Sequence, residues 1–396
     1  MKIIHTSDWH IGQLFNFHYD RQLEHQFFFD QLKKIIKEEK PDALIVSGDI
    51  YDKSTPANSS MRFFFDNLLK IVEVDKDMTI VITAGNHDSS SRLETDQGVW
   101  KLHNCHFVGS IERDNDQYLF DKHIIKVGDK GFIVAVPYLQ NYYNDFYNLI
   151  LKDVEKRNIN NLPVILMGHT TIADSDFSSH EIVNINEIVS IGGVNSLNIK
   201  EIDDSMYDYF ALGHIHTPQT LSNGKARYCG TPVQINFKED FQHSITKVEI
   251  LKRGEMPNIS TVDIQPLKFF YTIPSKPYIL DEALKILEMN LPEASGYVQL
   301  NILVDGPVPA DTENRIRNIL SKNEKLLYCD YKTTMLVSNK TEKILKPEFG
   351  LVEFKEKDPL EIALSHFQST YNYEMDSAMI ELMRTVINEV RNEYYR

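Results

Sequence analysis

Short apolar runs alternate with polar, helix-like segments along the first part of the chain. Each run has five or six residues and is rich in β-branched side chains, which is typical of strands buried on both faces. Helical spacing of Leu23, Phe27, Leu32 and Ile35 predicts a helix after the first strand, and Pro41 is expected to end it. Alternating strands and helices predict a layered α/β fold. The strands are predicted at 2–6 (KIIHT), 43–47 (ALIVS), 79–84 (TIVITA), 132–137 (FIVAVP), 164–168 (VILMG) and 209–213 (YFALG).

The pattern changes near residue 270. Between 298 and 304 every second residue is apolar, which is the period of a half-exposed strand. We therefore expect a main domain at 1–270 and a small α+β domain at 271–340. The elements of the small domain are predicted at 269–273 (strand), 282–289 (helix), 297–305 (strand) and 310–321 (helix), followed by the strand LLYCDYKTT.

The last segment, 341–396, is predicted to form two amphipathic helices. The first begins at Asp358, with Pro at the first helical position and Glu two residues further on, a recognised helix start. The second is expected to begin at Asp376. Such helices pack on their own domain or bind a partner helix or coiled coil, and the pattern leaves both open. Their apolar faces consist of Leu360, Leu364, Phe367 and Tyr371, and of Met379, Met383, Val386 and Val390.

The composition is that of an ordinary globular protein with two or three domains. Of 396 residues, 42% are hydrophobic and 25% are charged. There is no run of about 18 apolar residues and no basic segment ahead of an apolar one at the start, so neither a membrane span nor a secretory signal is expected. The cysteines at 105, 229 and 329 are far apart, which argues against disulfides or a cysteine zinc site and favours a reducing cytoplasm.

The net charge bears on the kind of partner. With 42 basic and 57 acidic residues the formal charge is −15, which disfavours a protein that attracts nucleic acid by its own charge. If the substrate is a nucleic acid, the local positive charge must come from bound metal ions or from a partner subunit.

Polar clusters follow five of the predicted strands. In each, an apolar strand ends and a turn presents Asp, Asn or His side chains. Because open α/β sheets bind ligands outside the carboxyl ends of their strands, these five ends predict one polar site. The clusters are Asp8-Trp9-His10, Gly48-Asp49-Ile50-Tyr51-Asp52, Gly85-Asn86-His87-Asp88, Gly168-His169 and Gly213-His214-Ile215-His216.

The side chains of these clusters are typical of a two-metal site. Imidazoles, carboxylates and one amide, without a thiolate, suit Mn, Fe, Zn or Ni, and mixed N/O sets fit two ions bridged by a carboxylate. Asp49 has two oxygens for such a bridge. Asp8 and His10 are two residues apart and point the same way along an extended loop. Two divalent ions (+4) with two carboxylate ligands (−2) leave about +2, which attracts a phosphodiester despite the acidic surface.

The series D-x-H, GD-x-x-D, GNHD, GH and GH-x-H resembles the calcineurin-like metallophosphoesterase superfamily. Within it, the segments HTSDWHIGQ, AVPYL, YFALGHIHTPQ and RYCGTPVQINFKED (227–240) are similar to the SbcD nuclease subunits. The resemblance is strong to about residue 240, looser in the small domain and a matter of pattern in the tail. It implies a layered metallophosphoesterase sandwich with a small α+β capping domain and a C-terminal helical tail.

The resemblance also implies roles for the clustered residues. His87 matches the family's histidine that assists the leaving group without binding metal, and Asp52 matches the residue that orients this histidine in related phosphatases. The family implies manganese, whereas the residues themselves do not choose between it and iron, zinc or nickel. The implied ligands are Asp8, His10, Asp49 and His216 for the first ion, and Asp49, Asn86, His169 and His214 for the second.

The same resemblance implies a DNA nuclease, both a double-strand 3′–5′ exonuclease and a single-strand and hairpin endonuclease. It would work with the coiled-coil ATPase SbcC in DNA repair and recombination, with the tail helices on the coil and the small domain capping the site. The aromatic runs at 27–29 and 63–65 fit a homodimer interface or the core, and Trp9 is expected to pack beneath its loop or to stack on a base. An enzyme for a small phosphoester or a phosphoprotein is the alternative, which the chain beyond residue 270 disfavours.

Overall fold

The structure is a computed structural model. It describes residues 1–115, 117–139, 144–172, 196–197, 199–336, 360, 364, 367 and 375–394. The chain divides into two compact units, Met1–Thr334 and Met335–Arg396, and each is described by itself.

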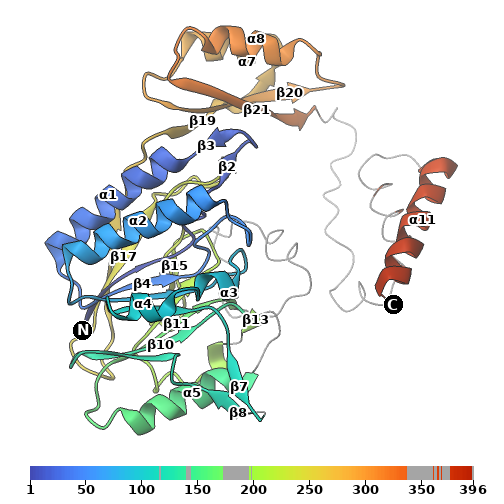
Figure 1. The fold of residues 1–396 in the computed structure, drawn as a ribbon. Coiled ribbons are helices and arrows are strands. Elements are labelled where there is room, and N and C mark those ends of the chain that lie inside the picture. The colour runs from blue at the N-terminus through green and yellow to red at the C-terminus, as the bar shows by residue number, and fades with distance from the viewer. Residues whose placement is uncertain are drawn as a thin grey trace. The chain divides into compact units, whose positions relative to one another are not determined.

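Two six-stranded sheets form the centre of the first unit (Figure 1). In the first sheet, the order is β18-β17-β1-β4-β5-β6, with β1, β4, β5 and β6 parallel, β17 antiparallel to β1, and β18 antiparallel to β17. Its strands are β1 (Lys2–Thr6), β4 (Ala43–Ser47), β5 (Thr79–Thr83), β6 (Cys105–Val108), β17 (Ser244–Glu249) and β18 (Asn258–Asp263).

In the second sheet, the order is β15-β16-β14-β11-β10-β9, with β10, β11, β14 and β16 parallel. Its strands are β9 (Ile124–Val127), β10 (Gly131–Val136), β11 (Val164–His169), β14 (Tyr209–Gly213), β15 (Gln219–Thr220) and β16 (Ala226–Tyr228). The six strands predicted from apolar runs are β1, β4, β5, β10, β11 and β14, and each is confirmed to within one residue at either end.

Strand side chains alternate between two cores, which accounts for the apolar runs. Ile3 and Ile45 pack between the two sheets, whereas Ile4 and Leu44 face the helices on the outer side. The helices α1 (Gln22–Glu39) and α2 (Asn58–Val74) cover the first sheet, and α5 (Asn144–Arg157) covers the second (Figure 1). The layered α/β sandwich is therefore confirmed.

Shorter elements connect these layers. They are the hairpin of β2 (Leu14–Phe15) and β3 (Tyr19–Asp20), α3 (Ser90–Leu93), α4 (Gln97–Lys101), the hairpin of β7 (Glu112–Asp114) and β8 (Gln117–Leu119), β12 (Thr171–Ile172), β13 (Ser196–Leu197) and the 3-10 turn at Ile199–Glu201.

The segment after residue 268 forms a three-stranded sheet of order β19-β20-β21, with its own apolar core. It is joined to the β2–β3 hairpin and to α1: the Tyr19 hydroxyl donates to the carbonyl of Tyr328 (2.6 Å), and the Tyr297 hydroxyl donates to Glu24 (2.8 Å). The domain boundaries at 270 and 340 stay predictions. The elements are β19 (Phe269–Ile279), α7 (Leu280–Met289), β20 (Gly296–Val304), α8 (Thr312–Leu320) and β21 (Leu326–Met335).

In the second unit, α11 (Ser377–Tyr394) is the helix predicted to begin near Asp376. Leu360, Leu364 and Phe367 are helical and half-buried, whereas Asp358 and Tyr371 lie outside the described residues. Across the described ranges, none of the helices combines the length and the apolar character that crossing a bilayer requires.

Candidate metal centre

The loops that follow β1, β4, β5, β11 and β14 meet at one place, where the carboxyl ends of the two sheets come together. The backbone N–H groups of Asp8 and His10 donate to the carbonyls of Gly48 and Asp49, both at 3.0 Å, so the first two loops run side by side. From the second sheet, the backbone N–H of His214 donates to the Asp8 carboxylate at 3.1 Å. The five loops thus form one polar site, as the sequence predicts.

Four candidate ligands have a left-handed backbone. The φ angle is 53° at Asp8, 47° at His10, 51° at Asp49 and 97° at His214. A residue other than glycine costs about 1–3 kcal/mol in such a conformation, and it persists only where the surrounding structure imposes it. The fold therefore bends these loops at the ligand positions, at a cost in stability.

Two glycines leave the room that this crowding requires. Gly48 has a φ of +84°, and a Cβ there would lie 2.2 Å from Nδ1 of His169. A Cβ on Gly85 would lie 2.1 Å from Oδ1 of Asp49. The glycines of the GD and GN pairs are therefore needed for close approach of the ligand side chains.

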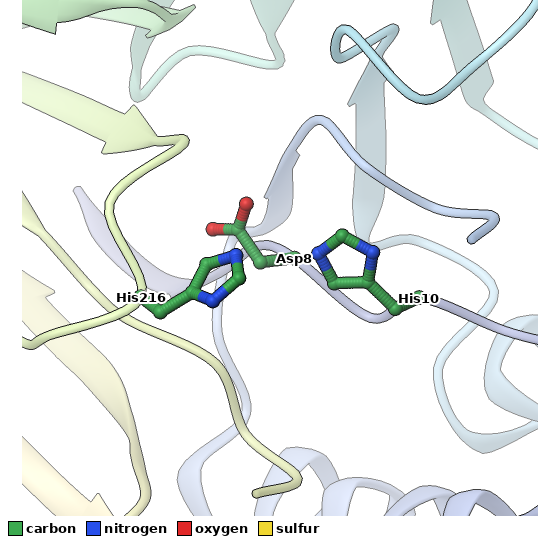
Figure 2. Close-up of side chains that lie close together, drawn as sticks. All are labelled: Asp8, His10 and His216. Carbon is green, nitrogen blue, oxygen red and sulfur yellow. The ribbon is translucent and has the colours of Figure 1, made fainter. Parts of the chain in front are cut away.

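Asp8, His10 and His216 form what we call the first cluster (Figure 2). Their potential ligand atoms all lie within 4.8 Å of one another, and the rings of His10 and His216 are 5.2 Å apart. His10 is 2% exposed, yet neither of its ring nitrogens has a hydrogen-bond partner among the described residues. Two buried imidazole nitrogens without hydrogen-bond partners, beside a carboxylate, fit the position of a metal ligand.

Asn86, His169 and His214 form the second cluster. The amide oxygen Oδ1 of Asn86 lies 3.0 Å from Nε2 of His169 and 3.0 Å from Nδ1 of His214. Asp49 stands between the clusters, since its Oδ2 is 3.4 Å from Nε2 of His169 and 3.8 Å from Nε2 of His10. The position of Asp49 suits a carboxylate that bridges two ions.

Two of the histidines are oriented by a second contact. Nδ1 of His169 donates to the carbonyl of Ser47 at 2.8 Å, and Nδ1 of His216 lies 3.2 Å from Oε1 of Glu239. In both cases the contact occupies one ring nitrogen and leaves Nε2 for a ligand. Metal-binding histidines are commonly held in this way.

His87 is the most exposed of the predicted site residues, and it borders the first cluster with its ring 5.0 Å from that of His10. Its Nδ1 donates to the backbone carbonyl of Asp52 at 2.8 Å, and its backbone N–H donates to Asp49 at 2.9 Å. The carboxylate of Asp52 instead lies 3.9 Å from Nδ1 of His10. Asp52 therefore contacts His87 through its main chain, and the catalytic roles of both residues stay predictions.

The charge state of the imidazoles depends on a balance between burial and nearby carboxylates. At His169 burial lowers the pKa, but the charge and hydrogen bond of Asp49, with smaller contributions from Asp8 and Ser47, together outweigh it and raise the pKa to about 9. At His216 burial again lowers the pKa, but the hydrogen bond with Glu239 and the charges of the nearby carboxylates together outweigh it, and the pKa is again about 9. Burial dominates at His214, whose pKa falls to about 3. Without a metal ion, the imidazole rings of His169 and His216 are therefore doubly protonated and positively charged at neutral pH.

Sequence reasoning assigned no role to Asp88 or Glu239, which both support the site. The Asp88 carboxylate accepts the backbone N–H groups of Gly85 (2.9 Å), Ile50 (3.1 Å) and Tyr51 (2.9 Å), and so joins two ligand loops. Burial raises its pKa to about 6. Asp88 is the last residue of the GNHD cluster, so its position in the sequence could have indicated a role in the site. Nothing in the spacing of Glu239 relates it to His216.

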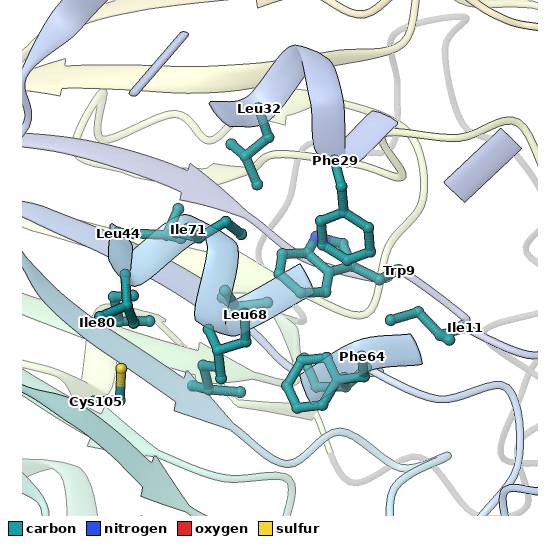
Figure 3. Close-up of a cluster of buried hydrophobic side chains, with 14 of the residues drawn as sticks. Trp9, Ile11, Phe29, Leu32, Leu44, Phe64, Leu68, Ile71, Ile80 and Cys105 are labelled. Atoms are coloured by element: carbon teal, nitrogen blue, oxygen red, sulfur yellow. The ribbon is translucent and has the colours of Figure 1, made fainter. Parts of the chain in front are cut away.

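Trp9 lies between two candidate ligands, and its side chain is 1% exposed. Its ring is 5.0 Å from that of Phe29 and 5.8 Å from that of Phe28, in the core beneath the loop (Figure 3). Phe63 and Phe64 are buried in the same core. Packing beneath the loop is thus the structural role of Trp9, and it holds the first ligand loop against α1 and α2.

The residues present fit divalent metal ions. Carboxylate, amide and imidazole donors converge from five loops, and thiolates are absent from this set. The orphaned nitrogens of His10 supply an observation that hydrogen bonding alone does not explain.

Comparisons with known proteins agree with this chemistry. A sequence profile of the calcineurin-like phosphoesterase family matches residues 1–218, more than half of the chain. The SbcD subunit of the SbcCD nuclease from Rhodobacter capsulatus is 29% identical over 275 residues, which cover 63% of this chain and 66% of that protein. The SbcD subunit from Staphylococcus epidermidis is 26% identical, covering 73% of this chain and 77% of that protein. The one from Escherichia coli is 28% identical, covering 67% and 68%.

Proposed function

The chain belongs to the calcineurin-like phosphoesterase family, and on this premise we propose that it is a metal-dependent DNA nuclease subunit of the SbcD type. The relatives named as nuclease subunits align over most of the chain, which supports a nuclease rather than a small-molecule phosphatase. The observation that carries the proposal is the convergence of seven predicted donors from five loops at one site, where His10 has no hydrogen-bond partner among the described residues.

The proposed centre holds two divalent ions, most readily Mn²⁺. We assign the first ion to Asp8, His10, Asp49 and His216, and the second to Asp49, Asn86, His169 and His214. When bound, two such ions polarise a phosphodiester and lower the pKa of a water. With two carboxylates among the donors, the loaded site keeps a positive charge of about +2, which draws the DNA backbone toward an otherwise acidic protein.

His87 is proposed to protonate the departing oxygen. Its Nδ1 hydrogen bond to the carbonyl of Asp52 fixes the ring and leaves Nε2 as the nitrogen that carries the transferable proton. It is more exposed than any of the seven proposed ligands, which suits a group that meets the substrate. His87 stands beside the first cluster, with a ring nitrogen within 4.8 Å of potential ligand atoms of His10 and Asp49.

The proposed partner is a coiled-coil ATPase of the SbcC type, in an assembly with two copies of each chain that processes DNA ends. The supporting observation is α11, on which Met379, Leu382 and Met383 are exposed by 46%, 65% and 38%. An exposed apolar stripe on a helix suits binding to another helix. A pull-down of the ATPase with chains that have or lack residues 345–396 tests the assignment; full association of the shortened chain would contradict it.

The nuclease proposal is tested with an end-labelled DNA hairpin, a blunt duplex and a generic phosphomonoester. We expect Mn²⁺-dependent cleavage of DNA that EDTA abolishes. His87→Ala should lower the cleavage rate about 10²–10⁴-fold, the usual contribution of a general acid, while Mn²⁺ binding measured by calorimetry is retained. Hydrolysis of the phosphomonoester without DNA cleavage would instead favour a phosphatase, and loss of Mn²⁺ from the variant would make His87 a ligand.

A further inference from the structure

Glu239 is a buried carboxylate in the segment 227–240, whose resemblance to the SbcD subunits assigns it no role. It is 2% exposed, in the segment that follows β16. Its Oε1 accepts from the amide of Asn236 at 3.0 Å and lies 3.2 Å from Nδ1 of His216. Its Oε2 accepts from the backbone N–H of Ile235 at 2.8 Å and from the hydroxyl of Thr231 at 3.4 Å. Every group around the carboxylate is therefore a donor or can act as one.

A carboxylate in this place is costly unless its neighbours compensate. In the part of the chain that the structure describes, Lys and Arg make no ion pair with Glu239; its ionic neighbours within 4.0 Å are His216 and His243. His243 is the more distant, with Nε2 at 3.9 Å. The strongest contact with a titratable group is thus with a member of the first cluster.

We propose that Glu239 is a positioning residue for the first ion: it holds the proton of His216 on Nδ1, so that Nε2 is the nitrogen free to bind metal. This inference rests on the proposed function, because it requires the ion. Fixing the tautomer and the ring direction through the second nitrogen is a general way in which proteins tune metal-binding histidines. The second cluster uses the carbonyl of Ser47 on His169 for the same purpose, so the two ions would be supported by different groups.

The Glu239→Gln variant separates this role from simple packing. A carboxamide has one acceptor and one donor end, whereas Ile235 and Asn236 both donate to the carboxylate. If the amide oxygen faces Ile235, the NH₂ group faces Nδ1 of His216, which must then become an acceptor. The His216 proton would move to Nε2 and occupy the nitrogen that the first ion needs.

Glu94→Gln is the matched control. Glu94 is a partly buried carboxylate that likewise ties a loop together, accepting from the backbone N–H of Gly109 (2.7 Å) and Ser110 (3.2 Å) and from Lys122 (2.9 Å). None of these partners is a candidate ligand. A general loosening of the fold would therefore affect both variants, whereas loss of His216 positioning would affect only Glu239→Gln.

The experiment is a calorimetric Mn²⁺ titration of the full chain, with the electron paramagnetic resonance spectrum of bound Mn²⁺ as a second readout. The wild type and Glu94→Gln should bind two ions and show the spectrum of a coupled pair. Glu239→Gln should bind one ion unchanged and the other about 10–100-fold more weakly, with an uncoupled Mn²⁺ spectrum at low occupancy. Two ions of unchanged affinity in Glu239→Gln, or equal weakening in Glu94→Gln, would overturn the inference and leave the proposed function standing.

A measurement on the wild type does not depend on how well the variant folds. In zinc-loaded protein with ¹⁵N-labelled histidine, the signal that His216→Ala removes should be that of a ring protonated on Nδ1 and bound through Nε2. A ring protonated on Nε2 would contradict the inference. Fewer than two ions in the wild-type titration would overturn the proposed two-ion function together with this inference.

Discussion

In the second cluster the polar atoms contact one another, with Asn86 Oδ1 3.0 Å from a ring nitrogen of both His169 and His214. In the first cluster, by contrast, both ring nitrogens of His10 are buried and have no hydrogen-bond partner in the part of the chain that the structure describes. The two clusters lie side by side and share Asp49. One half of the centre is therefore internally satisfied without an ion, and the other half is not.

This difference has an energetic consequence. A buried polar group without a partner costs about 1–3 kcal/mol, which an ion in the first cluster would remove. In the second cluster an ion must displace hydrogen bonds that already exist. Protein stability should thus depend more strongly on the first ion, although both clusters have similar donors.

The largest expected effect comes from Asp49→Ala, which removes the group that the two clusters share. We expect both ions to be lost, because each cluster loses a carboxylate within 4.0 Å of its histidines, and cleavage to fall by about 10³-fold or more. Calorimetry with Mn²⁺ and the DNA cleavage assay measure the two effects. Asp52→Asn, on the same loop, should keep both ions. One ion of full affinity in Asp49→Ala would mean that the clusters bind independently.

The sequence predicted the loops of this centre because the signals were local. A strand buried on both faces is a continuous apolar run, and the polar residues directly after it mark the edge of the sheet, as at Asp8 and His169. The contact between Glu239 and His216 could not be predicted from spacing, because it joins a loop to a strand end through tertiary packing alone.

In the helix α1, too, tertiary packing decides something that the sequence pattern does not, namely which side chains are buried. Its existence and its end before Pro41 follow from the pattern, but Leu23, included in the predicted apolar face, is 71% exposed. Phe28 and Phe29 are buried instead, against Trp9. Three consecutive phenylalanines offer the helix more than one apolar face, and the packing of the neighbouring loop decides which one is used.

A smaller effect should distinguish the clusters in the absence of metal. In EDTA, His10→Leu removes an unpaired imidazole and should leave the free energy of unfolding unchanged or raise it by about 1 kcal/mol. Asn86→Leu leaves His169 and His214 without their shared acceptor and should lower it by about 1–3 kcal/mol. Urea unfolding measures both. Added Mn²⁺ should stabilise the wild type more than His10→Leu. Equal destabilisation of the two variants in EDTA would show that the two clusters do not differ in internal hydrogen bonding.

The smallest expected effect is on the pH dependence of the metal-free protein. His169 and His216 have pKa values of about 9 in the folded state, above the ordinary 6.5, because carboxylates outweigh the effect of burial. Their contribution to stability is complete below about pH 6.5 and is lost as the pH rises through about 9. His214, with a lowered pKa of about 3, acts in the opposite sense and lowers stability as the pH falls below about 6.5.

The melting temperature in EDTA should therefore be highest near pH 6.5 and fall by a few degrees, on the order of 2–4 °C per kcal/mol lost, toward pH 9.5. With Mn²⁺ present the trend between these two pH values should reverse, because each ion must displace the protons of His169 and His216 and binds more tightly as they leave. Differential scanning calorimetry at both pH values, with EDTA and with Mn²⁺, gives the four melting temperatures.

His216→Ala should reduce the decline of the melting temperature in EDTA, because one of the two protons is then missing. A metal-free protein that became more stable between pH 6.5 and 9.5 would show that the carboxylates do not raise the pKa values of His169 and His216. The difference between the two clusters would then depend only on the unpaired ring nitrogens of His10.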